Sequence, residues 1–291
     1  MSEPSEWALR ATAHVARSAS GTALDRSLRV TLNFHPDRLV AGATVIEWLA
    51  HDGVYRSQFE TGTSNGGLTA HSGGARWRWE QRMFGHAYDD APEAERPKYG
   101  ALNHRRRRIG AAPRFGSAHL RLTEAVLDRS TFCFPDSVFE PTAMATADRF
   151  DLFDLVARFD ARERTDKIEA TEGGMLDDYL EAHVHGMITI ASDVEAVVLD
   201  PSFRDSPIES QAKSLGVPVE WHEGRRLIVA TLAEHPEFRG PRIVEVGRRI
   251  AEDGMLDAAV IGRAARAGHE DPQDLKKVWH CVARFGTPVD D

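Results

Sequence analysis

Hydrophobic and polar residues alternate with a period of two in several short runs through the first two thirds of the chain. This alternation predicts half-buried β-strands, because successive side chains of a strand point to opposite faces. Each run ends near proline, glycine or small polar residues, which favour turns. The predicted strands cover residues 28–34, 54–59, 118–122 and 130–134, with a strand, glycine turn and strand over 178–190 and a closing segment at 192–199.

Helical spacing of apolar residues prevails elsewhere, above all toward the C-terminus. It predicts helices over residues 5–20, 40–50, 148–167, 208–215, 243–250, 256–265 and 275–283, with one strand-like run at 226–230. Residues 71–108 follow neither period, so we expect a long surface excursion there. Strands first and helices last predict an α+β fold.

The charge balance argues against two classes of partner. The 291 residues include 36 Lys and Arg against 45 Asp and Glu, a formal net charge of -9. A protein that coats nucleic acid or an anionic membrane needs the opposite balance, so we expect neither partner. We interpret the arginines at residues 105–108 as a solvated loop tip and not as a nucleic-acid site, since no aromatic RNA-binding pattern accompanies them.

Cysteine usage and the N-terminal sequence bear on the cellular compartment. Cys133 and Cys281 are the two cysteines and form no CxxC pair, which excludes a disulfide framework and a zinc finger. Residues 1–24 lack the charged and then apolar profile of a signal peptide. We therefore expect a protein that is cytoplasmic where it is made, with export by a route that needs no signal peptide left open.

The densest group of chemically active residues lies in the predicted strand at residues 179–186 (YLEAHVHG). A period of two places Glu181, His183 and His185 on one face. Three readings are open at this point. In the first, these three side chains lie on a solvated face of the sheet. In the second, Glu181 is a lone carboxylate that stabilises a cationic transition state. In the third, the His-x-His pair and Glu181 bind iron or zinc.

Two further segments offer ligand-binding side chains. His35 and Arg38 follow the first predicted strand at a proline corner, where a ligand could be held, although local pairing of Asp37 with Arg38 explains them equally well. The loop at residues 60–67 contains three glycines among polar residues and lets a backbone approach a ligand closely, with a plain turn as the alternative. Its spacing matches neither a P-loop nor a dinucleotide GxGxxG motif, and no GxSxG nucleophile motif occurs in the chain.

Taken together, an ordered series of motifs resembles a bacterial family catalogued as a domain of unknown function. That family is similar to ADP-ribosyltransferases and to effectors that modify a threonine of ubiquitin. The motifs are NFHPDR, YRSQFETGTSNGG, RPKYGALN, APRFGS, RSTF with FPDS, and YLEAHVHG. The resemblance spans residues 28–204. It implies an ADP-ribosyltransferase-like catalytic domain there, preceded by a helical lead-in at 1–27 and followed by a mostly helical region at 205–291.

The resemblance implies a split, bent β-sheet with flanking helices, and NAD as the substrate. Glu181 would be the catalytic carboxylate, since a carboxylate stabilises the ribosyl cation left when nicotinamide departs. The acceptor would be a protein side chain, with threonine of ubiquitin as one possibility. The residues implied in holding NAD are His35, Arg38, Arg56, Thr63, Ser64, Tyr99, Phe115 and Ser117.

The sequence also departs from the transferase pattern. It contains no Ser-Thr-Ser triplet, His183 stands two residues beyond Glu181 where Glu or Gln is usual, and His35 precedes proline and not glycine. Two alternatives therefore stay open. One is a metal-dependent enzyme that uses the His-x-His pair, and the other is a catalytically inactive module that binds a nucleotide or a partner.

Overall fold

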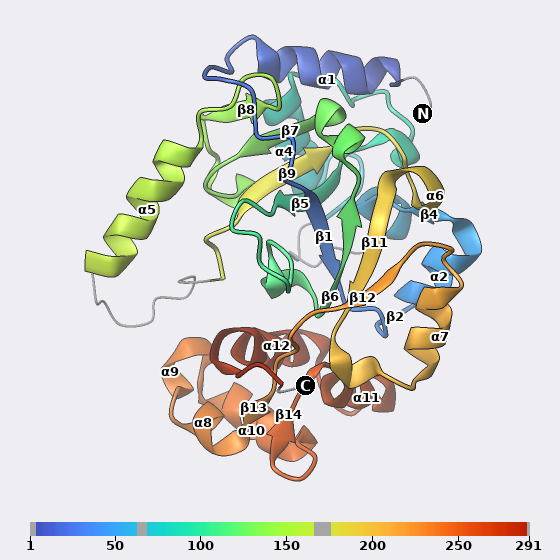
Figure 1. Cartoon of the computed structure of the whole chain (residues 1–291), viewed down its shortest axis with the longest axis vertical. Coiled ribbons are helices and arrows are strands. Elements are labelled where there is room, and N and C mark those ends of the chain that lie inside the picture. The colour runs from blue at the N-terminus through green and yellow to red at the C-terminus, as the bar shows by residue number, and fades with distance from the viewer. Residues whose placement is uncertain (1–3, 63–68, 166–175, 290–291) are drawn as a thin grey trace.

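An eight-stranded sheet forms the centre of the computed structural model, which describes residues 4–62, 69–165 and 176–289. Helices flank this sheet, and the last of them gather at one end of it, opposite the end where the first helix lies (Figure 1). The predicted α+β class is confirmed. The strands follow the order β12 (Val219–Trp221), β11 (Val194–Leu199), β6 (Ala118–Leu122), β1 (Val30–Phe34), β5 (Lys98–Leu102), β9 (Leu180–Val184), β7 (Ser130–Cys133) and β8 (Met144–Thr146).

Neighbouring strands of this sheet are antiparallel, apart from β11 and β12, which are parallel. Three two-stranded pairs lie outside it. They are β2 (Leu39–Val40) with β3 (Ala43–Thr44), β4 (Val54–Tyr55) with β10 (Ile188–Thr189), and β13 (Leu227–Ile228) with β14 (Met255–Leu256).

Helices alternate with the strands and then dominate the C-terminal part. The α-helices are α1 (Glu6–Ala16), α2 (Val45–Asp52), α3 (Gln58–Thr61), α4 (Ala75–Phe84), α5 (Phe153–Thr165), α6 (Ile190–Asp193), α7 (Pro207–Lys213), α8 (Val229–Ala233), α9 (Pro236–Arg239), α10 (Pro241–Ile250), α11 (Ala258–Ala267) and α12 (Pro272–Phe285). Short 3₁₀ turns include η1 (Glu93–Glu95), η2 (Pro113–Phe115), η3 (Glu124–Arg129), η4 (Ser137–Phe139) and η5 (Pro201–Phe203).

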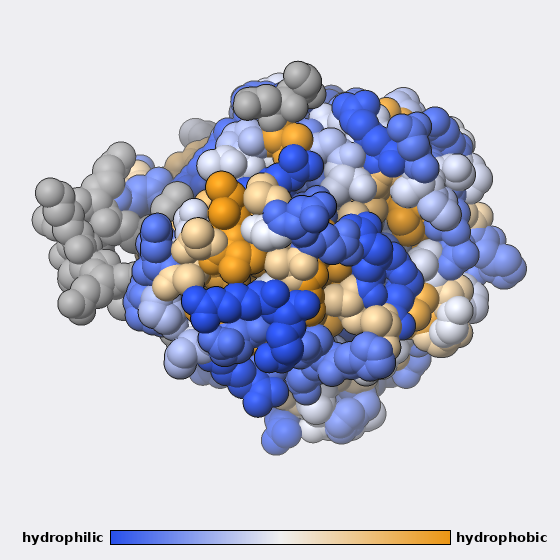
Figure 2. Space-filling model, turned by 90° about the horizontal axis from the view of Figure 1, so that it is seen from below, coloured by the Kyte–Doolittle hydropathy of each residue, from blue (hydrophilic) through white to orange (hydrophobic). Residues whose placement is uncertain are grey.

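One continuous hydrophobic cluster joins the sheet to the C-terminal helices. Leu32 of β1 and Leu120 of β6 are fully buried in it, and so is Trp279 of α12. The indole Nε1 of Trp279 also donates a hydrogen bond to the carbonyl of Pro113, at 2.8 Å. Helix α12 is therefore held against η2, which follows the central strands. From the side of these helices, the surface is mostly hydrophilic with scattered apolar residues (Figure 2).

The sheet opens between its two central strands. Val30 and Thr31 at the start of β1 pair with the last residues of β5. Toward its end at Phe34, β1 stays paired with β6 on its other side, and the start of β5 at Lys98 pairs with β9. Phe34 and Lys98 line a common cavity. At Gly100, β5 comes close to β1, since a Cβ added to this glycine would lie 2.5 Å from Leu32 Cδ2.

The structure corrects the expectation of a surface excursion at residues 71–108. This segment contains α4, whose Trp79, Met83 and Phe84 pack against α1, and the central strand β5. The predicted strand at 54–59 is also wrong in its second half, because Ser57 caps α3 there. The Ser57 side chain accepts from the Glu60 amide while the Glu60 carboxylate accepts from the Ser57 amide. A second capping box, at Thr44, fixes the start of α2 at Val45, whereas the sequence predicted a start at residue 40.

The segment that joins α4 to β5 contains a buried ion pair. Arg96 is 1% exposed, and its Nη1 lies 2.5 Å from Glu80 Oε2. Its guanidinium also stacks on Phe59 and Trp77, at 4.2 and 3.9 Å from the ring centroids. Removal of one partner leaves the other charge buried without compensation, which costs about 3–5 kcal/mol.

We therefore expect Arg96→Met to lower the free energy of unfolding by about 3–5 kcal/mol in urea denaturation. Arg82→Met is the matched control, because Arg82 pairs with Glu140 at 2.7 Å while both side chains are more than half exposed. An exposed pair contributes about 0–1 kcal/mol. Equal losses for the two variants would show that the buried pair has no special role.

Candidate active site

A cleft with three connected lobes lies where the sheet opens. The Glu181 lobe lies over β9 and β5, the α2 lobe lies between β1, α2 and β4, and the α12 lobe lies between η2, α11 and α12. Each pair of lobes shares lining residues. The shared residues are Tyr55, Gln58 and Tyr99 between the Glu181 and α2 lobes, Arg114, Phe115 and Lys276 between the Glu181 and α12 lobes, and His35 and Arg38 between the α2 and α12 lobes.

Glu181 is held in the cleft wall by several hydrogen bonds. Its side chain accepts from the Ser137 hydroxyl, from the Ser137 amide at 3.3 Å, and from His183 Nε2 at 2.9 Å. Burial by itself raises the pKa of this carboxyl group, but the bonds from His183 and Ser137, with the charge of Arg76, outweigh it and leave the pKa below its ordinary value. Glu181 is therefore a buried carboxylate that is ionised at neutral pH.

A row of hydrogen-bonded side chains continues from Glu181 into the core. Thr131 Oγ1 lies 3.1 Å from His183 Nδ1 and 3.0 Å from His185 Nε2, and the Tyr88 hydroxyl lies 2.6 Å from His185 Nδ1. All of these side chains are buried, so the reading of residues 181–185 as a solvated face is wrong. One assignment of protons satisfies every bond, with each group donating to the next from Tyr88 to Glu181.

The proposed His-x-His ligand pair does not converge on one point. His185 directs one ring nitrogen to Tyr88 and the other to Thr131, away from Glu181. Glu181 and His183 converge instead with Cys133, and the ligand atoms of these three residues lie within 4.8 Å of one another. Burial raises the pKa of the Cys133 thiol well above its ordinary value.

Basic side chains gather where the lobes meet. Arg38, Arg114 and Lys276 all line the α12 lobe, and Arg56 lines the α2 lobe. Burial, together with the charges of Arg114 and Arg38, lowers the pKa of Lys276 to about 8. Burial likewise lowers the pKa of Arg38. Three basic side chains in the α12 lobe, with Arg56 in the adjoining α2 lobe, favour an anionic ligand.

His35 occupies the junction of the α2 and α12 lobes. Its ring meets the edge of Trp279, with centroids 5.3 Å apart, and its Nδ1 lies 3.4 Å from the Ser117 hydroxyl. Burial, with the charges of Arg38 and Lys276, lowers the pKa of His35 to about 3, so the imidazole is neutral. His35 can thus act as a hydrogen-bonding group but not as a cation.

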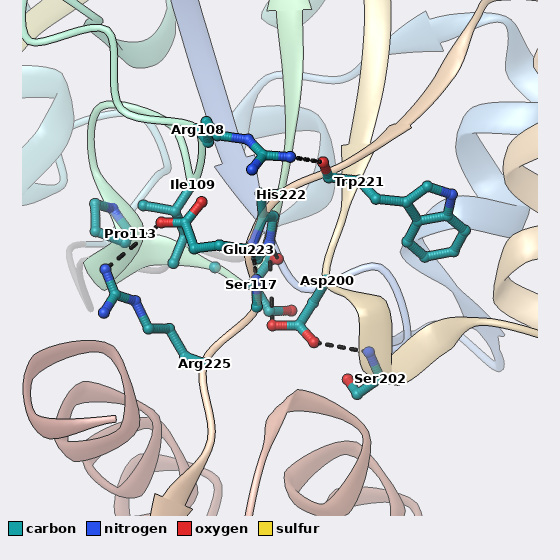
Figure 3. A network of polar contacts seen from close by, with 12 residues as sticks. Arg108, Ile109, Pro113, Ser117, Asp200, Ser202, Trp221, His222, Glu223 and Arg225 are labelled. Carbon is teal, nitrogen blue, oxygen red and sulfur yellow. Dashed lines mark hydrogen bonds and ion pairs between the residues drawn. The ribbon is translucent and has the colours of Figure 1, made fainter. Parts of the chain in front are cut away.

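Ser117 lies beneath the cleft and connects it to a second buried network. Its carbonyl accepts a hydrogen bond of 2.8 Å from His222 Nε2, and the amide of Gly224 donates to His222 Nδ1 at 2.9 Å. Figure 3 shows His222 beside Ser117, with the carboxylate of Asp200 nearby at 4.0 Å from the imidazole. The segment that follows β12 therefore fixes the backbone that supports His35.

The structure brings most of the predicted site residues together. Those that line the cleft are Glu181, His35, Arg38, Arg56, Tyr99 and Phe115. Ser117 is 1% exposed and reaches the cleft through His35, while Thr63 and Ser64 lie outside the described residues. Arg56 pairs with Asp52 at 2.7 Å. Phe59, which belongs to the same motif as Arg56, packs against the guanidinium of Arg96.

Sequence reasoning missed several residues of the cleft. Ser137 and Arg114 stand within the motifs FPDS and APRFGS, so a closer look at those motifs could have found them. Arg76 and Lys276 lie on helices α4 and α12, outside every motif. Nothing in the local sequence separates Lys276 from the neighbouring Lys277, since only the packing of α12 directs one of them to the cleft.

The fold and the cleft together define an α+β protein with a buried carboxylate beside a cleft lobe lined by basic side chains. Residues 29–159 and 151–285 match the model of the family described as Protein of unknown function (DUF3626), and the chain belongs to that family. No curated protein matches the chain. Among the helices of the described residues, none has the length and apolar character needed to cross a membrane.

Proposed function

We propose that the protein is a mono-ADP-ribosyltransferase that uses NAD and modifies a protein side chain. The observation that carries this proposal is the position of Glu181, an ionised carboxylate held in a cleft between diverging central strands, with basic side chains in the adjoining lobe. NAD is a dinucleotide with an anionic pyrophosphate and a glycosidic bond to a cationic ring. A cationic site next to a fixed carboxylate complements both of these features.

The pyrophosphate is assigned to Arg38, Arg114 and Lys276. A phosphate oxygen accepts charge-assisted hydrogen bonds from guanidinium and ammonium groups, which are stronger than neutral ones. An anion bound here also stabilises the charged form of Lys276, whose pKa is lowered by burial and then by the charges of Arg114 and Arg38. From this position the nicotinamide ribose reaches the Glu181 lobe, which shares Arg114 and Lys276 with the α12 lobe.

Tyr99 and Phe115 are the aromatic candidates for contact with nicotinamide. Both line the Glu181 lobe. The Tyr99 hydroxyl donates to Glu80 at 3.0 Å, and the Phe115 ring meets the edge of Tyr179 with centroids 5.4 Å apart. These contacts fix the Tyr99 ring on β5 and the Phe115 ring on η2, where an aromatic ligand gains from edge and face packing.

In the proposed reaction the bond between C1′ of the ribose and the nicotinamide nitrogen breaks, and nicotinamide leaves with the electron pair. The ribose gains oxocarbenium character, which the negative charge of Glu181 stabilises. The acceptor oxygen then bonds to C1′, and its proton passes to solvent. His183 and Ser137 keep Glu181 ionised and oriented, so they act through the carboxylate as positioning residues.

The acceptor side of the cleft has an exposed apolar turn. Val138 lines the Glu181 lobe and is 57% exposed, and Phe139 beside it is 60% exposed. Both belong to η4, the turn whose Ser137 binds Glu181. Exposed apolar groups beside an active site favour contact with another protein. We therefore assign η4 to the acceptor, for which the resemblance suggests ubiquitin.

We expect Phe139→Ser to lower the rate of protein modification about tenfold, a loss of about 1.4 kcal/mol in acceptor binding. The release of nicotinamide from NAD in the absence of an acceptor should stay unchanged, because the ring does not touch the carboxylate. Ile228→Ser, at a residue of similar exposure (54%) in β13, is the control. An equal loss in both rates would show that η4 serves the fold or NAD and not the acceptor.

The function itself is tested by incubating the purified chain with labelled NAD, with and without ubiquitin or a cell lysate. Intact mass and nicotinamide release are read together. A mass gain of one ADP-ribose on a protein supports the transferase. NAD binding without nicotinamide release would identify a binding module and would overturn the proposal.

A further inference from the structure

Cys133, His183 and Glu181 form a compact cluster of potential metal ligands on one face of the sheet. Cys133 of β7 is the register partner of Glu181 on β9, so the two side chains project side by side. His183 follows two residues after Glu181 on the same face. Its Nε2 lies 2.9 Å from Glu181 Oε1 and 3.9 Å from Cys133 Sγ.

The spacing of these atoms suits a small thiophilic cation. All three ligand atoms lie within 4.8 Å of one another, so an ion midway along the longest separation is at most half that distance from either end. Zinc bonds to cysteine sulfur at about 2.3 Å and to histidine nitrogen or carboxylate oxygen at about 2.0–2.2 Å. Zinc binding would therefore require the three ligand atoms to rearrange around the ion from the positions that they have in the structure.

The surroundings of His183 also match those of a metal-bound histidine. A histidine that binds a metal through one nitrogen usually donates the proton on its other nitrogen to a fixed acceptor. Here Thr131 Oγ1 lies 3.1 Å from His183 Nδ1, and the Thr131 hydroxyl can in turn donate to His185 Nε2, at 3.0 Å. The hydrogen-bonded row therefore accommodates the tautomer that metal binding requires.

The cluster adjoins the cleft through Glu181. Glu181 lines the Glu181 lobe, whereas Cys133 and His183 lie behind it at 0% exposure. Three protein ligands leave a fourth position on a zinc ion, which a water molecule can occupy. On binding, the metal–sulfur bond forms as the Cys133 thiol releases its proton to solvent, and the His183 proton moves to Nδ1.

We propose that Cys133, His183 and Glu181 bind one Zn²⁺ ion, and that the bound ion inhibits the enzyme. The binding part stands on the cluster alone. The inhibition part rests on the proposed transferase function, because a carboxylate that ligates a metal has lost the free negative charge that stabilises a ribosyl cation. The site thus links the availability of zinc to the catalytic carboxylate.

Cobalt(II) is the spectroscopic probe for the binding part. We expect the chelator-treated full chain to take up one Co²⁺ with a thiolate-to-cobalt charge-transfer band and with visible bands of tetrahedral intensity, both removed by added Zn²⁺. Cys133→Ser should abolish the charge-transfer band, and Cys281→Ser should retain it. These are the two cysteines of the chain, so the pair of variants identifies the ligand. Absence of the band in the parent protein, or its survival in Cys133→Ser, would overturn the site.

A second measurement avoids substitutions in the core. X-ray absorption of the unmodified protein with one equivalent of Zn²⁺ should show one sulfur at about 2.3 Å together with nitrogen and oxygen neighbours at about 2.0–2.2 Å. A shell of nitrogen and oxygen without sulfur would contradict the assignment of Cys133.

The inhibition part is tested by nicotinamide release in the presence of chelator and of one equivalent of Zn²⁺. We expect a loss of at least tenfold with zinc, and recovery when chelator is added. Zinc binding without a loss would overturn inhibition and leave the site intact. A protein that releases no nicotinamide under either condition would contradict the transferase, while the cobalt spectrum would still decide the metal site.

Discussion

Glu181→Gln is expected to lower nicotinamide release and protein modification by about 10²–10³-fold, the usual loss when one preorganised electrostatic contact to a transition state is removed. The amide has nearly the shape of the carboxylate and can still accept hydrogen bonds from Ser137 and His183. It lacks the negative charge that stabilises the ribosyl cation. The measurement is single-turnover nicotinamide release, with NAD affinity followed separately by calorimetry.

The affinity for NAD should change by no more than a few-fold in this variant. The pyrophosphate is assigned to the α12 lobe, whereas Glu181 lines the Glu181 lobe. Glu245→Gln is the control, since Glu245 is exposed on α10 and pairs with Arg248 of the same helix at 2.8 Å. That variant should have the parental rate. A Glu181→Gln protein that retains the parental rate would exclude Glu181 as the catalytic residue.

Lys276→Met is expected to raise the KM for NAD by about 10–100-fold, with a smaller effect on kcat. A hydrogen bond to a charged group contributes about 1.5–3 kcal/mol, which corresponds to this range. The adjacent Lys277→Met is a closely matched control, because Lys277 is exposed on the same helix while Lys276 lines the cleft. The same KM for both variants would show that α12 does not contact the substrate.

The pH dependence provides a second readout for Lys276. Burial and neighbouring cations lower its pKa to about 8, so the free enzyme loses this positive charge as the pH rises through that value. The KM for NAD should therefore rise above pH 8 in the parent protein. Lys276→Arg should lack this rise, because a guanidinium stays protonated throughout this range. A rise of equal size in both proteins would assign the titration to another group.

Most elements with a clear hydrophobic period could be predicted from the sequence. The prediction was wrong where a buried element lacks such a period. Strand β5 contains Lys98, Tyr99 and Gly100, so its composition is far from that of a typical central strand. It is central because β1 and β9 pair with it on both sides, and Gly100 permits the close approach of Leu32. No local pattern reveals pairing between distant segments.

The candidate site shows the same division between local and long-range information. Glu181 and His35 were predicted because strand ends and motif order point to them. The row on β9 was ambiguous, since the period of two fixes which residues share a face but not whether another element covers that face. Here α4 and the turn that carries Tyr88 cover it, and the packing of Phe84 against both histidines completes the burial.

The contribution of α12 to the cleft has a consequence for biosynthesis. Trp279 and Lys276 lie on α12, which is synthesised after β9 with Glu181 and after His35, the residue that follows β1. A chain that is still on the ribosome can assemble the sheet and its carboxylate before the residues that complete the α12 lobe have emerged. The α12 lobe, and with it the proposed contact with NAD, is therefore complete only after α12 has been synthesised and has packed against η2.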